Sequence, residues 1–170
     1  ASNAQIEGEI QAFVAFSILC QEAGYDGVEI MGSEGYFINE FIVERTNQRT
    51  DQWGGSYENR IRLPPQIIRR AADRVREDFT IIYRLSMLDL VEGGSSYAEV
   101  VQLGKALAEV GVTIMNTGIG WHEATIPTIA TKVPRAAFSW VTAKFKDEIP
   151  VPVITSKRIN TPEVAEEILS

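Results

Sequence analysis

The stretch from Val112 to Glu123, VTIMNTGIGWHE, decides the fold and points to the site. Its first six residues, 112–117, contain the apolar residues Val112, Ile114 and Met115 and predict a buried strand. Two glycines, Trp121 and the only histidine, His122, follow where that strand ends. In chains that alternate strands and helices, functional sites are built at this end of the strands. We therefore expect residues from the other strand ends to gather near His122.

The same organisation recurs four times: a helix, a short link, an apolar strand and a longer loop. Local signals mark the helices, such as the capping box of Ser96 and Glu99, while Pro64-Pro65 must bend or restart another helix. Strands are predicted over residues 25–31, 79–85, 112–117 and 151–155, and helices over residues 5–23, from Ser56 onward, 96–110, 136–146 and from Thr161 onward.

The order of these elements predicts the fold class. The strands lack clean polar alternation, which favours parallel strands covered by crossover helices. Long loops follow the strands and short links follow the helices, an asymmetry typical of a (β/α)₈ barrel. Four units make about half of such a TIM barrel, which needs about 250 residues. We predict an α/β half-barrel; a doubly wound sheet is the alternative, although no Gly-x-Gly-x-x-Gly turn supports a dinucleotide-binding half.

Composition excludes several classes of protein. The net charge of −7 argues against nucleic acid or a membrane surface as a partner, because such partners normally require a basic patch. No apolar run approaches the roughly 20 residues of a membrane span. With one cysteine, Cys20, and one histidine, neither an internal disulfide nor a protein-only metal site is expected. Cytoplasmic localisation is expected.

Both ends of the sequence suggest that the chain was cut from a longer one. Residues 1–4 resemble the remnant of a cleaved expression tag, so we exclude them and expect a partial barrel domain over residues 5–170. At the other end, a helix begins at Thr161-Pro162 and stops after a few residues. We expect an excised piece of a larger protein.

Four polar side chains, Tyr36, Arg84, His122 and Arg158, follow strands of four different units and would converge in a barrel. His122 suits proton relay, with a surface or capping role as the alternative. Tyr36 is either a packing aromatic or a proton donor. Arg158 lies where barrels often bind phosphate, or is a solvated charge.

Arg84 is more informative because a charge that ends a buried strand needs an anionic or carbonyl partner. An internal carboxylate is one candidate partner, and an electron-rich cofactor ring is the other. The carboxylates considered are Asp26, Glu29 and Glu34.

Several motifs together resemble the Old Yellow Enzyme family of flavin oxidoreductases. They are GVEI at 27–30, GYFINEF at 35–41, RTDQWGGS at 49–56 with Asn59-Arg60, and YRLS at 83–86. Many members carry a His-His or His-Asn pair that holds a substrate carbonyl, whereas Met31 and Glu34 occupy those positions here. With GIGWHE at 118–123, the resemblance is to the branch that reduces 2,4-dienoyl-CoA thioesters, over strands four to seven of its barrel.

The resemblance implies FMN as the cofactor of this barrel and an acyl-CoA as the substrate. Tyr36 would protonate the substrate with help from His122, and Arg84 and Arg158 would bind FMN. Substrate binding is implied for Arg45 and for His122, Glu123, Ala124 and Thr125. FAD, a 4Fe-4S cluster and NADPH are implied for the whole protein, outside this chain.

Three alternatives stay open. One is another flavin ene-reductase, or an amine dehydrogenase, of the same family. The second is a phosphate-binding barrel such as an aldolase, for which Lys157 is the nearest candidate to form a Schiff base. The third is a non-catalytic half-barrel, whose open sheet edges and uncovered interior would favour self-association.

Overall fold

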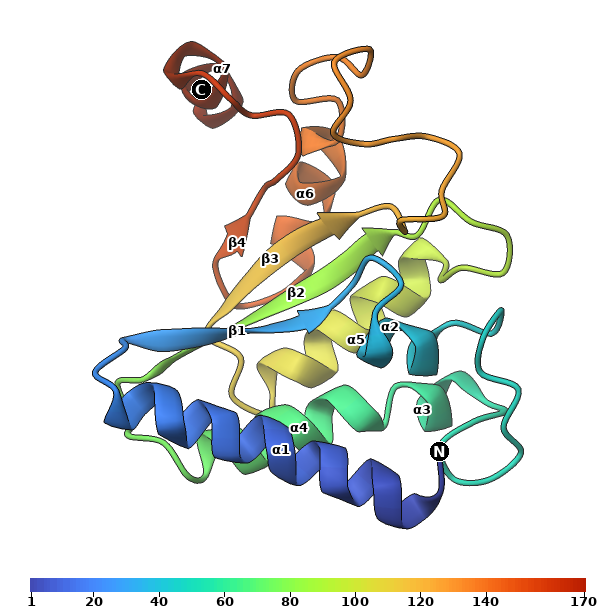
Figure 1. Cartoon of the computed structure of the whole chain (residues 1–170). Helices are drawn as coiled ribbons and strands as arrows, with labels where there is room; N and C mark the ends of the chain where they lie inside the picture. Colours follow the sequence, from blue (N-terminus) through green and yellow to red (C-terminus); the bar gives the residue numbers. More distant parts are fainter.

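A four-stranded parallel sheet organises the chain, and the computed structural model describes all of residues 1–170 (Figure 1). The strands are β1 (Gly27–Gly32), β2 (Thr80–Leu88), β3 (Ile114–Ile119) and β4 (Val153–Ile154). The helices are α1 (Asn3–Glu22), α2 (Phe37–Ile42), α3 (Tyr57–Arg60), α4 (Leu63–Ala72), α5 (Tyr97–Ala108), α6 (Ser139–Phe145) and α7 (Pro162–Leu169), with a 3-10 turn η1 (Lys146–Glu148) after α6.

The strands pair in the order in which they occur in the chain, β1-β2-β3-β4, and every pair is parallel. A doubly wound sheet would instead reverse its strand order part of the way across. Helices α1, α4 and α5 lie together along one side of the sheet (Figure 1), with α1 packed on α4 and β1, and α5 packed on β2. The predicted α/β half-barrel is therefore confirmed.

The two faces of the sheet differ in burial. Toward the helices, β1 and β2 bury apolar side chains such as Ile30, Ile81 and Tyr83, each at most 1% exposed. The opposite face carries the row Met31, Arg84, Asn116 and Ile154, which the register places side by side across the four strands. Glu29 and Ile154 on this face are exposed, so the face that would line a barrel interior is open. The sequence predicts that helices cover the strands, and this is correct for the face toward α1, α4 and α5 but not for the opposite face.

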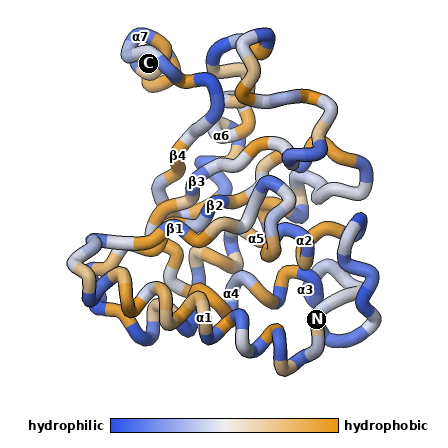
Figure 2. The backbone as a smooth tube through the Cα atoms, viewed as in Figure 1, coloured by the Kyte–Doolittle hydropathy of each residue, from blue (hydrophilic) through white to orange (hydrophobic).

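Hydropathy along the chain follows this layering. Figure 2 shows apolar segments recurring along the strands and the helices beside them, and a largely hydrophilic stretch in the loop between α2 and α3. No helix combines the length and apolar character that crossing a lipid bilayer requires.

The first residues of the chain take part in the fold, contrary to their exclusion above. Ser2 caps α1 by accepting a hydrogen bond from the Gln5 amide, and the Gln5 side chain accepts one from the Ser2 amide in return. The indole Nε1 of Trp53 donates to Asn3 at 3.1 Å. Helix α1 therefore begins at Asn3, two residues earlier than predicted, because local capping chemistry is available there.

Several boundaries shift by a few residues. Pro64 and Pro65 lie in the first turn of α4, where missing amide hydrogens cost little, so the prolines restart the helix as predicted. The capping box of Ser96 and Glu99 is present at the start of α5. Strand β2 ends at Leu88, three residues after its predicted end at Leu85, and β3 ends at Ile119, two residues after its predicted end at Thr117. Helix α6 begins at Ser139, three residues later than predicted.

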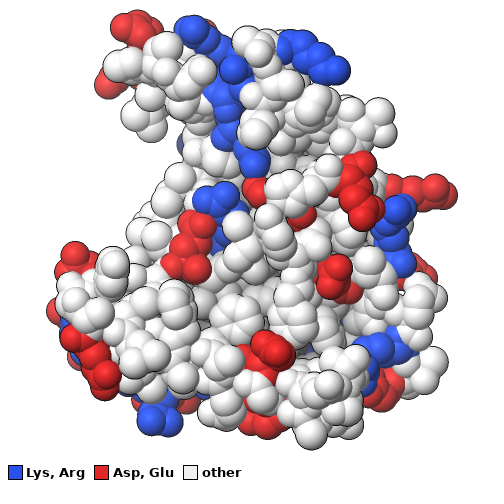
Figure 3. Space-filling model, viewed as in Figure 1, with Lys and Arg blue, Asp and Glu red and all other residues white.

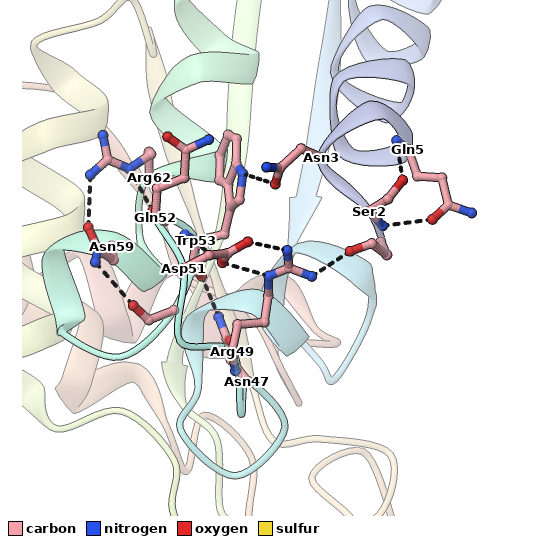
Figure 4. Close-up of polar contacts among 12 residues, drawn as sticks. Ser2, Asn3, Gln5, Asn47, Arg49, Asp51, Gln52, Trp53, Asn59 and Arg62 are labelled. Atoms are coloured by element: carbon pink, nitrogen blue, oxygen red, sulfur yellow. Dashed lines mark hydrogen bonds and ion pairs between the residues drawn. The ribbon is translucent and has the colours of Figure 1, made fainter.

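The polar loop between α2 and α3 is held by its own side chains (Figure 4). Asn47 donates to the carbonyl oxygens of Phe41 and Trp53 at 2.6 and 2.7 Å. Arg49 forms an ion pair with Asp51, and the hydrogen bond from this guanidinium lowers the pKa of the Asp51 carboxyl. The loop is therefore ordered, as its arginine and aromatic content predicts.

Two helical glycines provide a matched test of the packing between α5 and α6. A Cβ at Gly104 would lie 2.6 Å from the buried ring of Phe145, whereas a Cβ at Gly8 on α1 would meet nothing within 4 Å. Both Gly→Ala changes gain the same helix propensity. We expect Gly104→Ala to be less stable than Gly8→Ala by about 1–3 kcal/mol, the usual cost of overpacking. Urea unfolding of both variants measures the difference, and equal stabilities would contradict the packing.

Candidate active site

The loops that leave the four strands share an unusual backbone feature. Each strand is followed by a residue in the left-handed region: Glu34 (φ 65°), Leu90 (φ 58°), Gly120 (φ 76°) and Lys157-Arg158 (φ 73° and 61°). For residues other than glycine this conformation costs about 1–3 kcal/mol and is concentrated at functional sites. The carboxyl edge of the sheet is therefore where the structure concentrates backbone strain.

Two predicted site residues meet at this edge. The Nε2 atom of His122 lies 2.7 Å from the hydroxyl oxygen of Tyr36, and the two rings pack edge to face with centroids 5.1 Å apart. Tyr36 comes from the loop after β1 and His122 from the loop after β3. Both side chains are exposed, Tyr36 to 48%, so the pair can reach a bound molecule.

A cavity of about 570 Å³ surrounds the pair. Its other lining residues include Arg45 and Glu123, which form an ion pair at 3.6 Å. Ala124 and Thr125, the remaining predicted substrate contacts, do not line this cavity. The space is a size that accommodates a small organic ligand. The structure thus brings Tyr36, His122, Arg45 and Glu123 together.

Arg84 lies on the open face of the sheet and does find carboxylate partners. Its Nε donates to Glu29 at 2.8 Å, and its Nη1 is 3.7 Å from Glu34. The amide of Asn116 donates to the other oxygen of Glu29 at 2.6 Å, and Lys157 pairs with Glu34 at 2.6 Å. Figure 3 shows basic and acidic side chains adjoining one another at the centre of the face in view. Of the three carboxylates predicted as possible partners of Arg84, Glu29 and Glu34 contact it and Asp26 does not.

Arg158 is directed elsewhere. Its Nε donates to the carbonyl oxygen of Val133 at 3.0 Å, and its Nη2 donates to that of Thr131 at 3.4 Å. These carbonyls belong to the loop between β3 and α6. The guanidinium therefore holds this loop, and the structure does not bring it to Tyr36 and His122.

Sequence reasoning missed two contributors to this edge. Lys157 was considered only as a Schiff-base candidate, yet it is the ion-pair partner of Glu34, with both side chains only 13% and 12% exposed. Asp89 was not considered, although it is buried and accepts hydrogen bonds from helix α2 and from the loops after β2 and β3. An acidic residue directly after the apolar strand β2 was the available signal.

A parallel half-barrel with a Tyr–His pair, a cavity and a charged row at its carboxyl edge has the arrangement of a TIM-barrel enzyme. The chain belongs to the NADH:flavin oxidoreductase / NADH oxidase family, whose model matches residues 1–170. The resemblance to flavin oxidoreductases is thus confirmed for the family, which implies FMN and a nicotinamide cofactor.

Individual relatives agree with this family. NADH oxidase of Thermoanaerobacter brockii is 38% identical over 168 residues, or 98% of this chain and 26% of that protein. A solved 2-naphthoyl-CoA reductase with 2-naphthoyl-CoA has a TM-score of 0.94 and 31% identity over 98% of this chain and 26% of the other. The old yellow enzyme homologue from Zymomonas mobilis has a TM-score of 0.78 and 25% identity, covering 99% and 46%. The chain spans about a quarter of the first two proteins.

The open face of the sheet fits a flat, hydrogen-bonding cofactor such as FMN. The buried Oδ1 atom of Asn116 has no hydrogen-bond partner, although it neighbours Arg84 in the sheet register. Arg84 donates only through Nε, so its other N–H groups remain for an acceptor. A ring with carbonyl and N–H groups on one edge would satisfy both side chains. No group of three His, Cys, Asp or Glu residues is arranged to hold a metal ion.

Flavin binding tests this fit. We expect FMN to bind the chain saturably and Arg84→Ala to weaken binding by about tenfold to a hundredfold, the equivalent of one or two charge-assisted hydrogen bonds. Flavin fluorescence during titration measures the affinity. Arg74→Ala on the exposed surface is the matched control and should bind as the unmodified chain does. Equal affinities for the Arg84 and Arg74 variants would contradict the assignment.

Proposed function

We propose that this chain is the central part of an FMN-dependent reductase that acts on 2,4-dienoyl-CoA thioesters. The observation that carries the proposal is the 2.7 Å hydrogen bond between Tyr36 and His122 at the edge of a flavin-family half-barrel. A phenol and an imidazole in contact provide a proton donor and a group that stabilises the phenolate left behind.

Reduction of a conjugated thioester adds one hydride and one proton across the double-bond system. When bound, reduced FMN supplies the hydride. The Tyr36 hydroxyl gives its proton to the substrate carbon that becomes carbanionic, and the Nε2–H of His122 donates to the phenolate oxygen as it forms. Arg84, fixed by Glu29 at 2.8 Å, would help to hold FMN on the open face and would stabilise negative charge on its reduced ring.

Recognition of the acyl-CoA rests on the cavity beside the pair. Arg45 is the only cation that lines it, and its partner Glu123 is 70% exposed. An exposed ion pair is weak, so a phosphate group of a CoA ester can replace Glu123. The segment from His122 to Thr125 would contact the acyl portion of the acyl-CoA substrate. A CoA thioester is also the ligand of the solved 2-naphthoyl-CoA reductase, which supports this substrate class.

The rest of the reaction belongs to parts outside this chain. By resemblance we propose that NADPH delivers electrons through FAD and a 4Fe-4S cluster, and that Arg158 contributes to FMN phosphate binding. Ordinary enone reductases are less well supported. In many of them a His-His or His-Asn pair holds the carbonyl, whereas here Met31 and Glu34 occupy those positions and Glu34 pairs with Lys157 at 2.6 Å.

Replacing the proton donor tests the proposed chemistry. In a protein that contains this chain with the remainder of its barrel, we expect Tyr36→Phe to lower the rate of 2,4-dienoyl-CoA reduction by about 10²–10⁴-fold, the usual contribution of general acid catalysis. Loss of dienoyl-CoA absorbance with NADPH measures the rate. The exposed Tyr25→Phe is the matched control. An unchanged rate in Tyr36→Phe would exclude this residue as the acid.

We also propose that the isolated chain self-associates. The outer edge of β1 has no strand partner, and the open face of the sheet exposes Ile154 to 41%. Unpaired edges of this kind recruit strands from other copies. Light scattering should give a mass above the 18.9 kDa of one chain, rising with concentration. A constant monomeric mass would reject this proposal.

A further inference from the structure

A buried carboxylate outside the cavity connects the loops that carry Tyr36 and His122. Asp89 directly follows β2 and is 4% exposed. Its Oδ1 accepts hydrogen bonds from the Ser86 hydroxyl at 2.7 Å, the Trp121 indole at 2.9 Å and the Asn39 amide at 3.3 Å. Its Oδ2 accepts from the Ser95 amide at 2.7 Å. Four donors from separate segments therefore share one carboxylate.

The first connection leads to His122. Trp121 is held twice by the same residue, through its indole to the Asp89 carboxylate and through its amide to the Asp89 carbonyl oxygen, both at 2.9 Å. The indole is 7% exposed, and His122 is the next residue. The backbone amide of Gly120, the residue before Trp121, also donates to the carbonyl oxygen of Leu88 at 2.7 Å. The backbone that leads to His122 is therefore fixed against the end of β2.

The second connection leads to Tyr36. The Asn39 side chain donates to Asp89 and accepts a hydrogen bond from the Gly35 amide at 2.9 Å, directly before Tyr36. Gly35 has a φ of 83°, and a Cβ there would lie 2.9 Å from the Trp121 indole. The Trp121 ring is thus packed against the turn that presents Tyr36, so the two connections meet.

We infer that Asp89 is the positioning residue of the Tyr36–His122 pair: through Trp121 on one side and Asn39 on the other, it sets the distance between the proton donor and the imidazole. This inference rests on the proposed function only for its catalytic consequence. The geometric statement stands without it, because all of the contacts lie within this chain.

The single histidine makes the pair directly observable. In ¹⁵N-edited NMR spectra of the 170-residue chain, every imidazole signal belongs to His122. Tyr36→Phe defines the signal of an imidazole without its phenol partner. We expect Asp89→Asn to shift the His122 signals toward those of Tyr36→Phe, because an amide has one acceptor oxygen and cannot accept both from Ser95 and from the donors of Trp121 and Asn39. Asp73→Asn on the exposed end of α4 is the control and should leave them unchanged.

A second, milder variant tests the inference in case Asp89→Asn does not fold. Trp121→Phe keeps an aromatic ring near Gly35 and removes the indole donor to Asp89. It should move the His122 signals in the same direction by a smaller amount, with backbone amide dispersion preserved. Folded Asp89→Asn and Trp121→Phe variants with the His122 signals of the unmodified chain would overturn the inference.

A kinetic cycle in the flavin-loaded larger protein tests the catalytic consequence. Asp89→Asn should lower kcat by about tenfold, since small displacements of a reacting group are costly. In the Tyr36→Phe background the same change should lower kcat by less than about twofold, because a residue that acts through Tyr36 has nothing left to position. Equal losses in both backgrounds would overturn the inference. Absence of dienoyl-CoA turnover would reject the proposed function while leaving the NMR result to decide the geometry.

Discussion

Parallel pairing of four strands in chain order is the constraint on which the rest of the structure depends. Because β1 to β4 run in one direction, the loops after them leave from the same edge of the sheet. Residues as far apart in sequence as Tyr36 and His122, or Glu34 and Lys157, are brought into contact only by this arrangement. The helices stabilise it by covering one face with apolar side chains, which leaves the other face free for the row that contains Arg84 and Asn116.

This division of the sheet explains how charged groups are tolerated at its centre. Arg84 and Glu29 lie at 26% and 30% side-chain exposure, so neither pays the full cost of leaving water. Glu34 and Lys157 are more enclosed, and they meet that cost by direct contact at 2.6 Å. The same residues occupy left-handed backbone conformations that their ion pair helps to hold. These charges therefore lie on the open face of the sheet and in the loops at its carboxyl edge, and the backbone strain lies in those loops.

Local features could be predicted from the sequence because they depend on neighbours in the chain. The capping box of Ser96, the prolines of α4 and the four strands are of this kind. The pairing of Tyr36 with His122 was expected from the barrel topology and the family resemblance together. The partners of Arg84 could not be chosen among three carboxylates, because they depend on the strand register, which pairs Arg84 with Met31 and so puts Glu29 diagonally across on the same face, and on the turn that brings Glu34 near. Asp89 escaped notice since its partners Asn39 and Trp121 lie 50 and 32 residues away.

The ion pair between Glu34 and Lys157 has a consequence for how the molecule reaches its final form. It joins residues 123 positions apart and connects the end of the first strand to that of a last strand only two residues long. Contacts that close such long segments are entropically costly and form late. We expect the segment around β4 to order last during folding and to open first in the native ensemble, which faster amide hydrogen exchange there than in β2 would reveal. The edge that carries the chemistry would then be completed by the least persistent strand of the sheet.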